Sequence, residues 1–138
     1  TMSGDILGTL RYMSPEQAAG KNRVVDHRSD IYSLGATLYE LLCLRPVFVS
    51  DNQQKLVRQV AEDDPPPLRR LNKFVPADLE TIVLKAVAKE PARRYATSQE
   101  MADDLRRFLD RRSARPRQAE RGRLQDRTDA SSLQKGAR

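Results

Sequence analysis

The sequence predicts an all-α fold. Apolar residues recur at the three- and four-residue spacing of helices in several segments. No segment shows the strict alternation of apolar and polar residues that is typical of a half-buried strand, and no internal repeat is visible. The chain has 138 residues, of which 38% are hydrophobic, so it is long enough for one domain with a modest core.

The first predicted helix is short and follows a loop. Residues 1–13 are polar, contain glycines and lack a sustained period, so we expect an extended segment there. A helix over 15–19 is predicted because Ser14 suits the N-cap, a proline occupies the first position, and Glu16 suits the positive end of the helix dipole. Gly20 is expected to end it.

The most apolar segment, about 30–44, predicts a long central helix. Apolar side chains lie on nearly every side, so a complete domain should bury it all round, and it is too short to cross a bilayer. Ser29 can cap it. Gly35 costs about 1 kcal/mol relative to alanine, which is better tolerated where another backbone comes close. The apolar residues are Ile31, Tyr32, Leu34, Ala36, Leu38, Tyr39, Leu41, Leu42, Cys43 and Leu44.

Three amphipathic helices are expected to surround this central helix. The first covers about 51–62, is capped by Ser50 or Asp51, and has only a narrow apolar stripe. Residues 65–76 open with three prolines and are expected to form a loop. The second helix covers 78–89. Its apolar face is formed by Leu79, Ile82, Val83, Ala86 and Val87.

The third amphipathic helix begins at a capping box formed by Thr97 and Glu100 and reaches about Arg112. Its stripe consists of Met101, Leu105, Phe108 and Leu109. The chain is therefore divided into a helical domain over 1–112 and a tail over 113–138. The tail is rich in polar and charged residues and is expected to be disordered.

The net charge of +6 belongs to the tail. Residues 1–110 carry 16 basic and 16 acidic residues, whereas residues 111–138 carry 9 basic and 3 acidic ones. Such a tail can attract nucleic acid or anionic lipid electrostatically. No aromatic residue is interleaved with its arginines after Phe108, so a base-stacking platform is excluded and no specific nucleic-acid partner is expected.

Cys43 and His27 are the only cysteine and the only histidine. Cys43 cannot form an internal disulfide and is expected to be a small buried hydrophobe in a reducing compartment. His27 is expected on the surface near the start of the central helix, and neither a metal site nor a catalytic thiol is predicted. There is no leader or membrane-spanning run in the sequence, and we expect a cytoplasmic location.

Two stretches resemble adjoining signatures of bacterial serine/threonine protein kinases, which are eukaryotic-like kinases. Residues 8–17, Gly-Thr-Leu-Arg-Tyr-Met-Ser-Pro-Glu-Gln, are similar to the end of the activation segment. Residues 30–35, Asp-Ile-Tyr-Ser-Leu-Gly, are similar to the start of the central helix of the helical lobe. The resemblance implies that residues 1–112 form the C-terminal part of that lobe, with the family's helices F, G, H and I.

The resemblance also implies a substrate-side loop. Thr9 matches the threonine of the loop that receives the substrate residue after the phosphoacceptor, and its hydroxyl is expected near the catalytic aspartate. Thr1 and Ser3 fall where such kinases carry activating phosphorylation, which would add about −1.5 to −2 charges; ordinary loop hydroxyls are the alternative. The implied loop residues are Gly8, Thr9, Leu10, Arg11 and Tyr12.

Two structural roles follow from the same resemblance. Glu16 matches a glutamate that pairs with an arginine late in the lobe; here Arg94 is expected, with Arg93 as the competitor. Asp30, in the signature that also contains Gly35, matches the aspartate that accepts backbone hydrogen bonds from the catalytic loop. An acid in the first turn is also expected for the helix dipole alone.

The reacting groups of the family are absent from the 138 residues. Protein kinases hold ATP and Mg²⁺ with a Gly-rich loop, a strand lysine, a catalytic loop and an Asp-Phe-Gly motif, and none of these occurs here. We therefore expect the chain to bind no cofactor and to be inactive alone. In the parent kinase it would use ATP and Mg²⁺, with protein substrates and the upstream kinase segments as partners.

Two hypotheses remain. In the first, the chain, which starts at Thr1 rather than a methionine, is a fragment of an active serine/threonine kinase. In the second, it is a stand-alone helical docking module or an inactive kinase remnant. In the first case, upstream segments would cover part of the central helix, so the chain alone should expose apolar surface.

Overall fold

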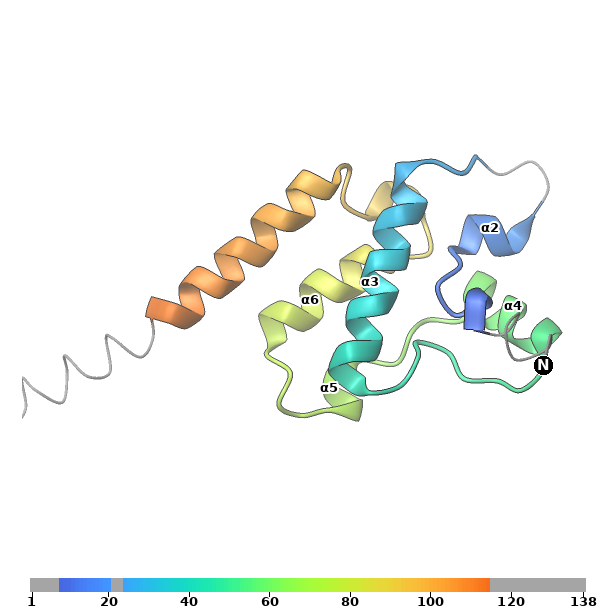
Figure 1. Ribbon diagram of the computed structural model, residues 1–138, viewed down its shortest axis with the longest axis horizontal. Coiled ribbons are helices and arrows are strands. Elements are labelled where there is room, and N and C mark those ends of the chain that lie inside the picture. Colours follow the sequence, from blue (N-terminus) through green and yellow to red (C-terminus); the bar gives the residue numbers. More distant parts are fainter. Residues whose placement is uncertain (1–7, 21–23, 115–138) are drawn as a thin grey trace, which may run out of the picture. The chain divides into compact units, whose positions relative to one another are not determined.

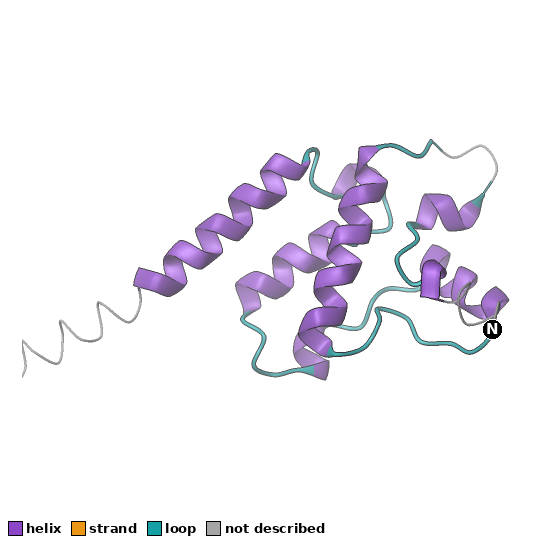
Figure 2. Cartoon of the chain, in the orientation of Figure 1, coloured by secondary structure: helices purple, strands orange, loops and turns teal. Residues whose placement is uncertain are grey.

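The computed structural model describes residues 8–20 and 24–114, and Figure 1 shows their helices. Figure 2 shows helices joined by loops, and none of these residues lies in a strand. The all-α prediction is therefore confirmed. The chain consists of two compact units, one that ends at Asp104 and one that begins at Leu105. The residues of the core cluster all belong to the first unit.

Helix α2 has the predicted bounds, Pro15–Ala19. The Ser14 hydroxyl accepts a hydrogen bond from the Gln17 amide at 3.3 Å, and the Ser14 amide donates to the Gln17 side chain at 3.0 Å. This reciprocal capping box satisfies two of the amides that a helix leaves unpaired at its start. Gly20 ends the helix with a φ of 76°, a conformation that glycine adopts without strain.

Helix α3, His27–Cys43, begins earlier than expected. Its N-cap is Asp26, whose carboxylate accepts a hydrogen bond from the Arg28 amide at 2.9 Å. The prediction that Ser29 caps this helix was therefore wrong, because a second capping residue lies three positions upstream. Ser29 instead lies buried in the first turn. Leu44 ends α3 in the left-handed conformation, with a φ of 56°.

Only part of α3 is covered by the described residues. Ile31, Ala36 and Tyr39 are buried, whereas Leu34 and Leu41 are 47% and 67% exposed. The expectation that this chain alone exposes apolar surface is confirmed.

The covered face of α3 packs against α6 (Ala77–Ala86) and α5 (Leu68–Leu71). Gly35 lies at the closest approach. A Cβ atom at this position would lie 2.6 Å from Ala86 Cβ and 2.9 Å from Val87 Cγ1. The helical glycine is therefore required because α6 leaves no room for a side chain, in agreement with the expected close approach.

Helix α4, Gln53–Glu62, packs against α2. Its N-cap is Asn52, whose side chain accepts a hydrogen bond from the Lys55 amide at 3.1 Å. The expected caps, Ser50 and Asp51, were therefore wrong. The Ser50 hydroxyl instead accepts from the Asn52 amide at 3.1 Å, which fixes the turn before the cap.

Two further boundaries differ from the prediction. The segment 65–76 is not loop throughout, because α5 forms directly after the prolines and its Leu68 is buried. Helix α6 ends at Ala86 rather than at Lys89, and a 3₁₀ turn, η1 (Pro91–Arg93), follows. Apolar spacing alone does not indicate these ends, because Val87 is buried although it lies outside the helix.

The last helix spans 98–114. At its start the Thr97 hydroxyl accepts from the Glu100 amide at 3.2 Å, as expected. The Glu100 carboxylate accepts from the Ala96 amide at 3.2 Å, one residue before the expected partner. Beyond Asp104, in the second unit, the Arg112 guanidinium lies 5.9 Å from the centre of the Phe108 ring. The helix continues two residues past its expected end at Arg112, so residues 113 and 114 are not part of a disordered tail; the rest of the predicted tail, 115–138, lies outside the described residues.

Candidate functional site

The loop that precedes α2 is anchored in the core. Residues 8–10 form one helical turn, and Leu10 is buried. The Tyr12 amide donates to the Thr9 carbonyl at 3.3 Å, and the Met13 amide donates to the Leu10 carbonyl at 3.2 Å. Thr9 itself is exposed. The loop therefore presents Thr9 outward while Leu10 holds the backbone.

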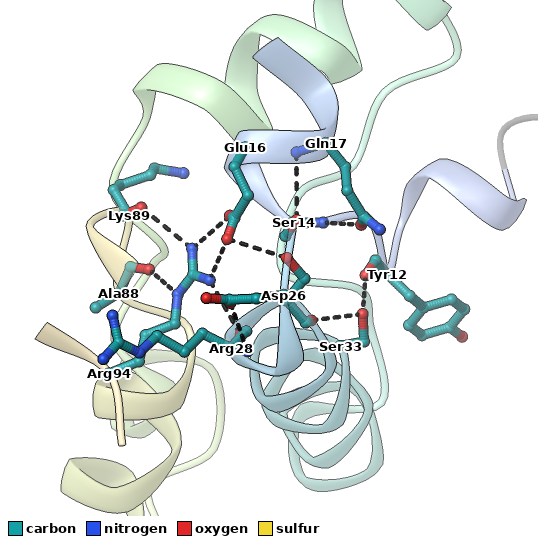
Figure 3. A network of polar contacts seen from close by, with 11 residues as sticks. Tyr12, Ser14, Glu16, Gln17, Asp26, Arg28, Ser33, Ala88, Lys89 and Arg94 are labelled. Atoms are coloured by element: carbon teal, nitrogen blue, oxygen red, sulfur yellow. Dashed lines mark hydrogen bonds and ion pairs between the residues drawn. The ribbon is translucent and has the colours of Figure 1, made fainter. Parts of the chain in front are cut away.

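Tyr12 fastens the same loop to α3 at two points. Its hydroxyl donates a hydrogen bond to the Glu40 carboxylate at 2.5 Å, and its carbonyl accepts from the Ser33 hydroxyl at 2.7 Å, the contact drawn in Figure 3. The bond to the Glu40 carboxylate, aided by burial, raises the pKa of Tyr12. Local spacing in the sequence does not identify this pair, because Tyr12 and Glu40 are 28 positions apart.

Glu16 and Arg94 form a buried, bidentate ion pair (Figure 3). Arg94 Nη1 lies 2.7 Å from Glu16 Oε2, and Arg94 Nη2 lies 2.7 Å from Glu16 Oε1. The side chains are 0% and 5% exposed for Arg94 and Glu16, respectively. The competitor Arg93 is exposed. The pair joins α2 to the segment that follows η1.

The other polar atoms of this pair also have partners. Arg94 Nε donates to the Ala88 carbonyl at 2.7 Å, Nη1 to the Arg28 carbonyl at 3.0 Å, and Nη2 to the Lys89 carbonyl at 3.1 Å. The Ser29 hydroxyl donates to Glu16 Oε2 at 3.1 Å. A buried charge pair is tolerated when its remaining hydrogen-bonding capacity is used in this way.

This network shifts two pKa values. Burial alone would raise the pKa of Glu16, but the hydrogen bonds from Arg94, the backbone and Ser29, with the charge of Arg94, outweigh it and lower that pKa below its ordinary value. Burial raises the pKa of Tyr32 to about 12, although the nearby Arg94 charge opposes the shift. The Arg94 guanidinium lies 5.1 Å from the centre of the Tyr32 ring, within reach of a cation–π interaction.

The remaining sequence-predicted residues lie apart from the ion pair. Asp30 is exposed in the first turn of α3, and Gly35 faces α6. In the substrate-side loop, Gly8 is half-buried and Arg11 is exposed. The phosphorylation candidates Thr1 and Ser3 lie outside the described residues.

His27 and Cys43 are the first and last residues of α3. With 17 residues in this helix, about 24 Å separates them along its axis, so they cannot form a nucleophile–base pair. His27 Nε2 lies 2.6 Å from the Ala96 carbonyl. Cys43 is half-buried rather than buried, its Sγ lies 3.9 Å from the Leu68 carbonyl, and burial raises the pKa of its thiol.

No three His, Cys, Asp or Glu side chains gather at a metal-binding distance within 8–20 and 24–114. In the same part of the chain, no helix combines the length and hydropathy needed to span a membrane.

Comparison with known proteins connects this arrangement to a family. The sequence-family model of the protein kinase domain matches residues 2–110. Serine/threonine-protein kinase PknB of Mycobacterium leprae is 44% identical over 105 residues, which are 76% of this chain and 17% of that protein. PknB of Mycobacterium tuberculosis strain H37Rv is 45% identical over 105 residues, which are 76% of this chain and 16% of that protein.

A more distant relative, the probable serine/threonine-protein kinase SCO3848 of Streptomyces coelicolor, is 40% identical over 110 residues, covering 80% of this chain and 16% of the relative. The chain thus spans about a sixth of the length of these proteins. The kinase-domain match includes the loop, the ion pair and the central helix described above. We conclude that the chain belongs to the protein kinase family and carries part of its helical lobe.

Proposed function

We propose that this chain is part of the catalytic domain of a serine/threonine kinase, which transfers the γ-phosphate of ATP to hydroxyl groups of protein substrates. The observation that supports this most directly is the kinase-domain match over residues 2–110. The ATP requirement favours a cytoplasmic location. The family implies ATP and Mg²⁺ as cofactors, and we propose that groups outside these 138 residues bind them.

In this proposal, residues 8–12 form the substrate-side loop. Thr9 is exposed, and its neighbours Leu10 and Tyr12 hold the loop backbone against the core and α3. A side chain presented on a fixed backbone is what the positioning of a phosphoacceptor requires. The Thr9 hydroxyl would then lie beside the catalytic aspartate supplied by another segment.

The two structural roles are proposed on the same basis. The Glu16–Arg94 pair would hold the end of the activation segment, because it fixes α2 directly after the loop. Asp30 would accept amide hydrogen bonds from the catalytic loop. Its exposure in the first turn of α3 leaves its carboxylate accessible to such a segment.

The test uses the complete open reading frame that encodes this chain. Purified protein should transfer labelled phosphate from ATP to a protein rich in serine and threonine. Thr9→Val should lower the rate by about 10²-fold, since the loop geometry is disturbed at the reacting centre, whereas Thr9→Ser should keep most of it. Thr81→Val, which removes an exposed hydroxyl of α6 bonded to Ala77, is the matched control.

Two results would contradict the proposal. One is the absence of phosphate transfer by the complete protein, and the other is full activity of Thr9→Val. Phosphopeptide mapping of the active protein tests Thr1 and Ser3 separately, because a modified activation segment should carry phosphate at one or both positions.

A further inference from the structure

A lysine from outside α4 fastens the C-terminal end of this helix. Lys89 Nζ donates hydrogen bonds to the Val60 carbonyl at 2.6 Å and to the Gln59 carbonyl at 3.2 Å. The same ammonium lies 4.5 Å from the centre of the Phe48 ring. Three groups from two separate segments thus surround one half-buried cation.

This end of α4 is unfavourable without a cation. An α-helix leaves its last carbonyls without intrahelical partners, and its C-terminal end carries partial negative charge. Helix α4 has no basic residue in its last turn, and Glu62, Asp63 and Asp64 add three acidic side chains there. The Gln59 carbonyl already accepts from the Asp63 amide at 2.9 Å, so Lys89 adds a second donor there, supplies a donor to the Val60 carbonyl and brings the positive charge that this end lacks.

The main chain of Lys89 belongs to the ion-pair network. Its carbonyl accepts a hydrogen bond from Arg94 Nη2 at 3.1 Å, and Arg94 pairs with Glu16 of α2. Helix α2 in turn packs against α4. Lys89 therefore completes a closed set of contacts that runs from α4 through Arg94 to α2 and back to α4.

We propose that Lys89 is a positioning residue that fixes the last turn of α4 relative to α2. This inference concerns the fold and holds whether or not the proposed phosphate transfer occurs. The turn that Lys89 fixes contributes to a surface groove of about 410 Å³ along α4. The groove is lined by Asn52, Gln54, Lys55, Arg58, Gln59 and Asp63. Lys89 thus determines the shape of one end of this groove without lining it.

Burial of the Lys89 ammonium sets the sign of its pH dependence. Burial lowers the pKa of Lys89 to about 8 from 10.5, while Asp63 and Asp64 oppose the shift and Arg94 adds to it. Between these pH values the unfolded chain binds more protons than the folded chain, so the free energy of unfolding increases as pH rises. The neutral amine still has two N–H groups for the two carbonyls.

Amide hydrogen exchange of the 138-residue chain, followed by NMR, tests this proposal. Lys89→Met should lower the protection of amides 59–63 about tenfold relative to α6 amides, since two charge-assisted hydrogen bonds are lost. Lys85→Met is the matched control, because Lys85 also lies over an aromatic ring, that of Tyr95 at 4.4 Å. It should leave amides 59–63 unchanged. Lys89→Arg should restore part of the protection, because a guanidinium also donates.

The wild-type chain provides a test that needs no variant. The Lys89 ¹³Cε signal should titrate near pH 8. Protection of amides 59–63, corrected for intrinsic exchange, should rise between pH 7 and 9 relative to α6. In Lys89→Arg this rise should be absent. Equal protection of amides 59–63 in the Lys89→Met and Lys85→Met chains would overturn the proposal.

Discussion

The two faces of α3 differ in how far neighbouring residues bury them, although both faces carry apolar side chains. On one face, Ser29, Tyr32, Gly35 and Tyr39 are buried against α5, α6 and the Arg94 network. On the other, Leu34, Leu41 and the cap residue Leu44 remain exposed. The apolar pattern of a helix therefore indicates every face that is suited to burial, whether or not the described residues bury that face. In the proposed parent kinase, other segments of the domain would cover the exposed face.

Breaking the ion pair at the covered face should have the largest effect. Glu16→Ala or Arg94→Ala should each lower the free energy of unfolding by about 3 to 5 kcal/mol, because the remaining partner is a buried charge without compensation. Urea denaturation of the 138-residue chain measures this. Glu90→Ala, at an exposed residue without a side-chain cap, is the control. A loss below about 1 kcal/mol would show that the pair is dispensable.

Filling the space at Gly35 should have the next largest effect. Gly35→Ala gains about 1 kcal/mol of helix propensity, but the added Cβ overlaps Ala86 and Val87. Overpacking of about 1 to 3 kcal/mol should exceed that gain, so the variant should unfold at lower urea concentration. Gly8→Ala meets no atom within 4 Å and should be neutral. If Gly35→Ala is the more stable variant, α3 and α6 are not in close contact.

Acid should lower the free energy of unfolding less than the substitution of Glu16 or Arg94 by alanine does. Because the pKa of Glu16 is lowered, its contribution is fully present above the ordinary value of 4.5 and declines as pH falls through the lower, folded-state value. Urea midpoints measured from pH 6 down to pH 3 should therefore decrease. Glu16→Gln should reduce this decrease. An unchanged pH dependence in that variant would assign the acid sensitivity to other carboxylates.

Substitution on the exposed face should change stability least. Leu41→Ser should alter the free energy of unfolding by less than about 0.5 kcal/mol, because the side chain already contacts water. It should nevertheless lower the fluorescence of a bound hydrophobic dye, since it interrupts the row of exposed leucines. Leu38→Ser, at a partly buried neighbour that packs on the core, should cost more. Equal losses for both would mean that the two faces do not differ.

The sequence predicted the features that depend on local chemistry. The bounds of α2 follow from a serine, a proline and a glycine at fixed positions. The helical character of α3, α4 and α6 follows from apolar spacing. The expectation that Arg94 rather than Arg93 pairs with Glu16 came from the resemblance to the kinase family, and the structure places Arg94 against Glu16.

Features that depend on tertiary contacts could not be predicted. Asp26 and Ser29 are both good N-cap residues, and only the burial of Ser29 against Glu16 decides between them. Helix α5 has four residues, too few for a periodic signal. Lys89 looked like the end of an amphipathic helix. Its bonds to Val60 and Gln59 cross 29 and 30 residues and leave no trace in local sequence.

The sequence separation of the Glu16–Arg94 pair bears on how the chain folds. The two residues are 78 positions apart, so the pair cannot form before the intervening helices have brought their ends together. We expect it to be absent from the folding transition state. Loss of either partner would then accelerate unfolding and leave the folding rate nearly unchanged. The ion pair would then slow the unfolding of the folded lobe, and it would thereby determine the lifetime of the native state.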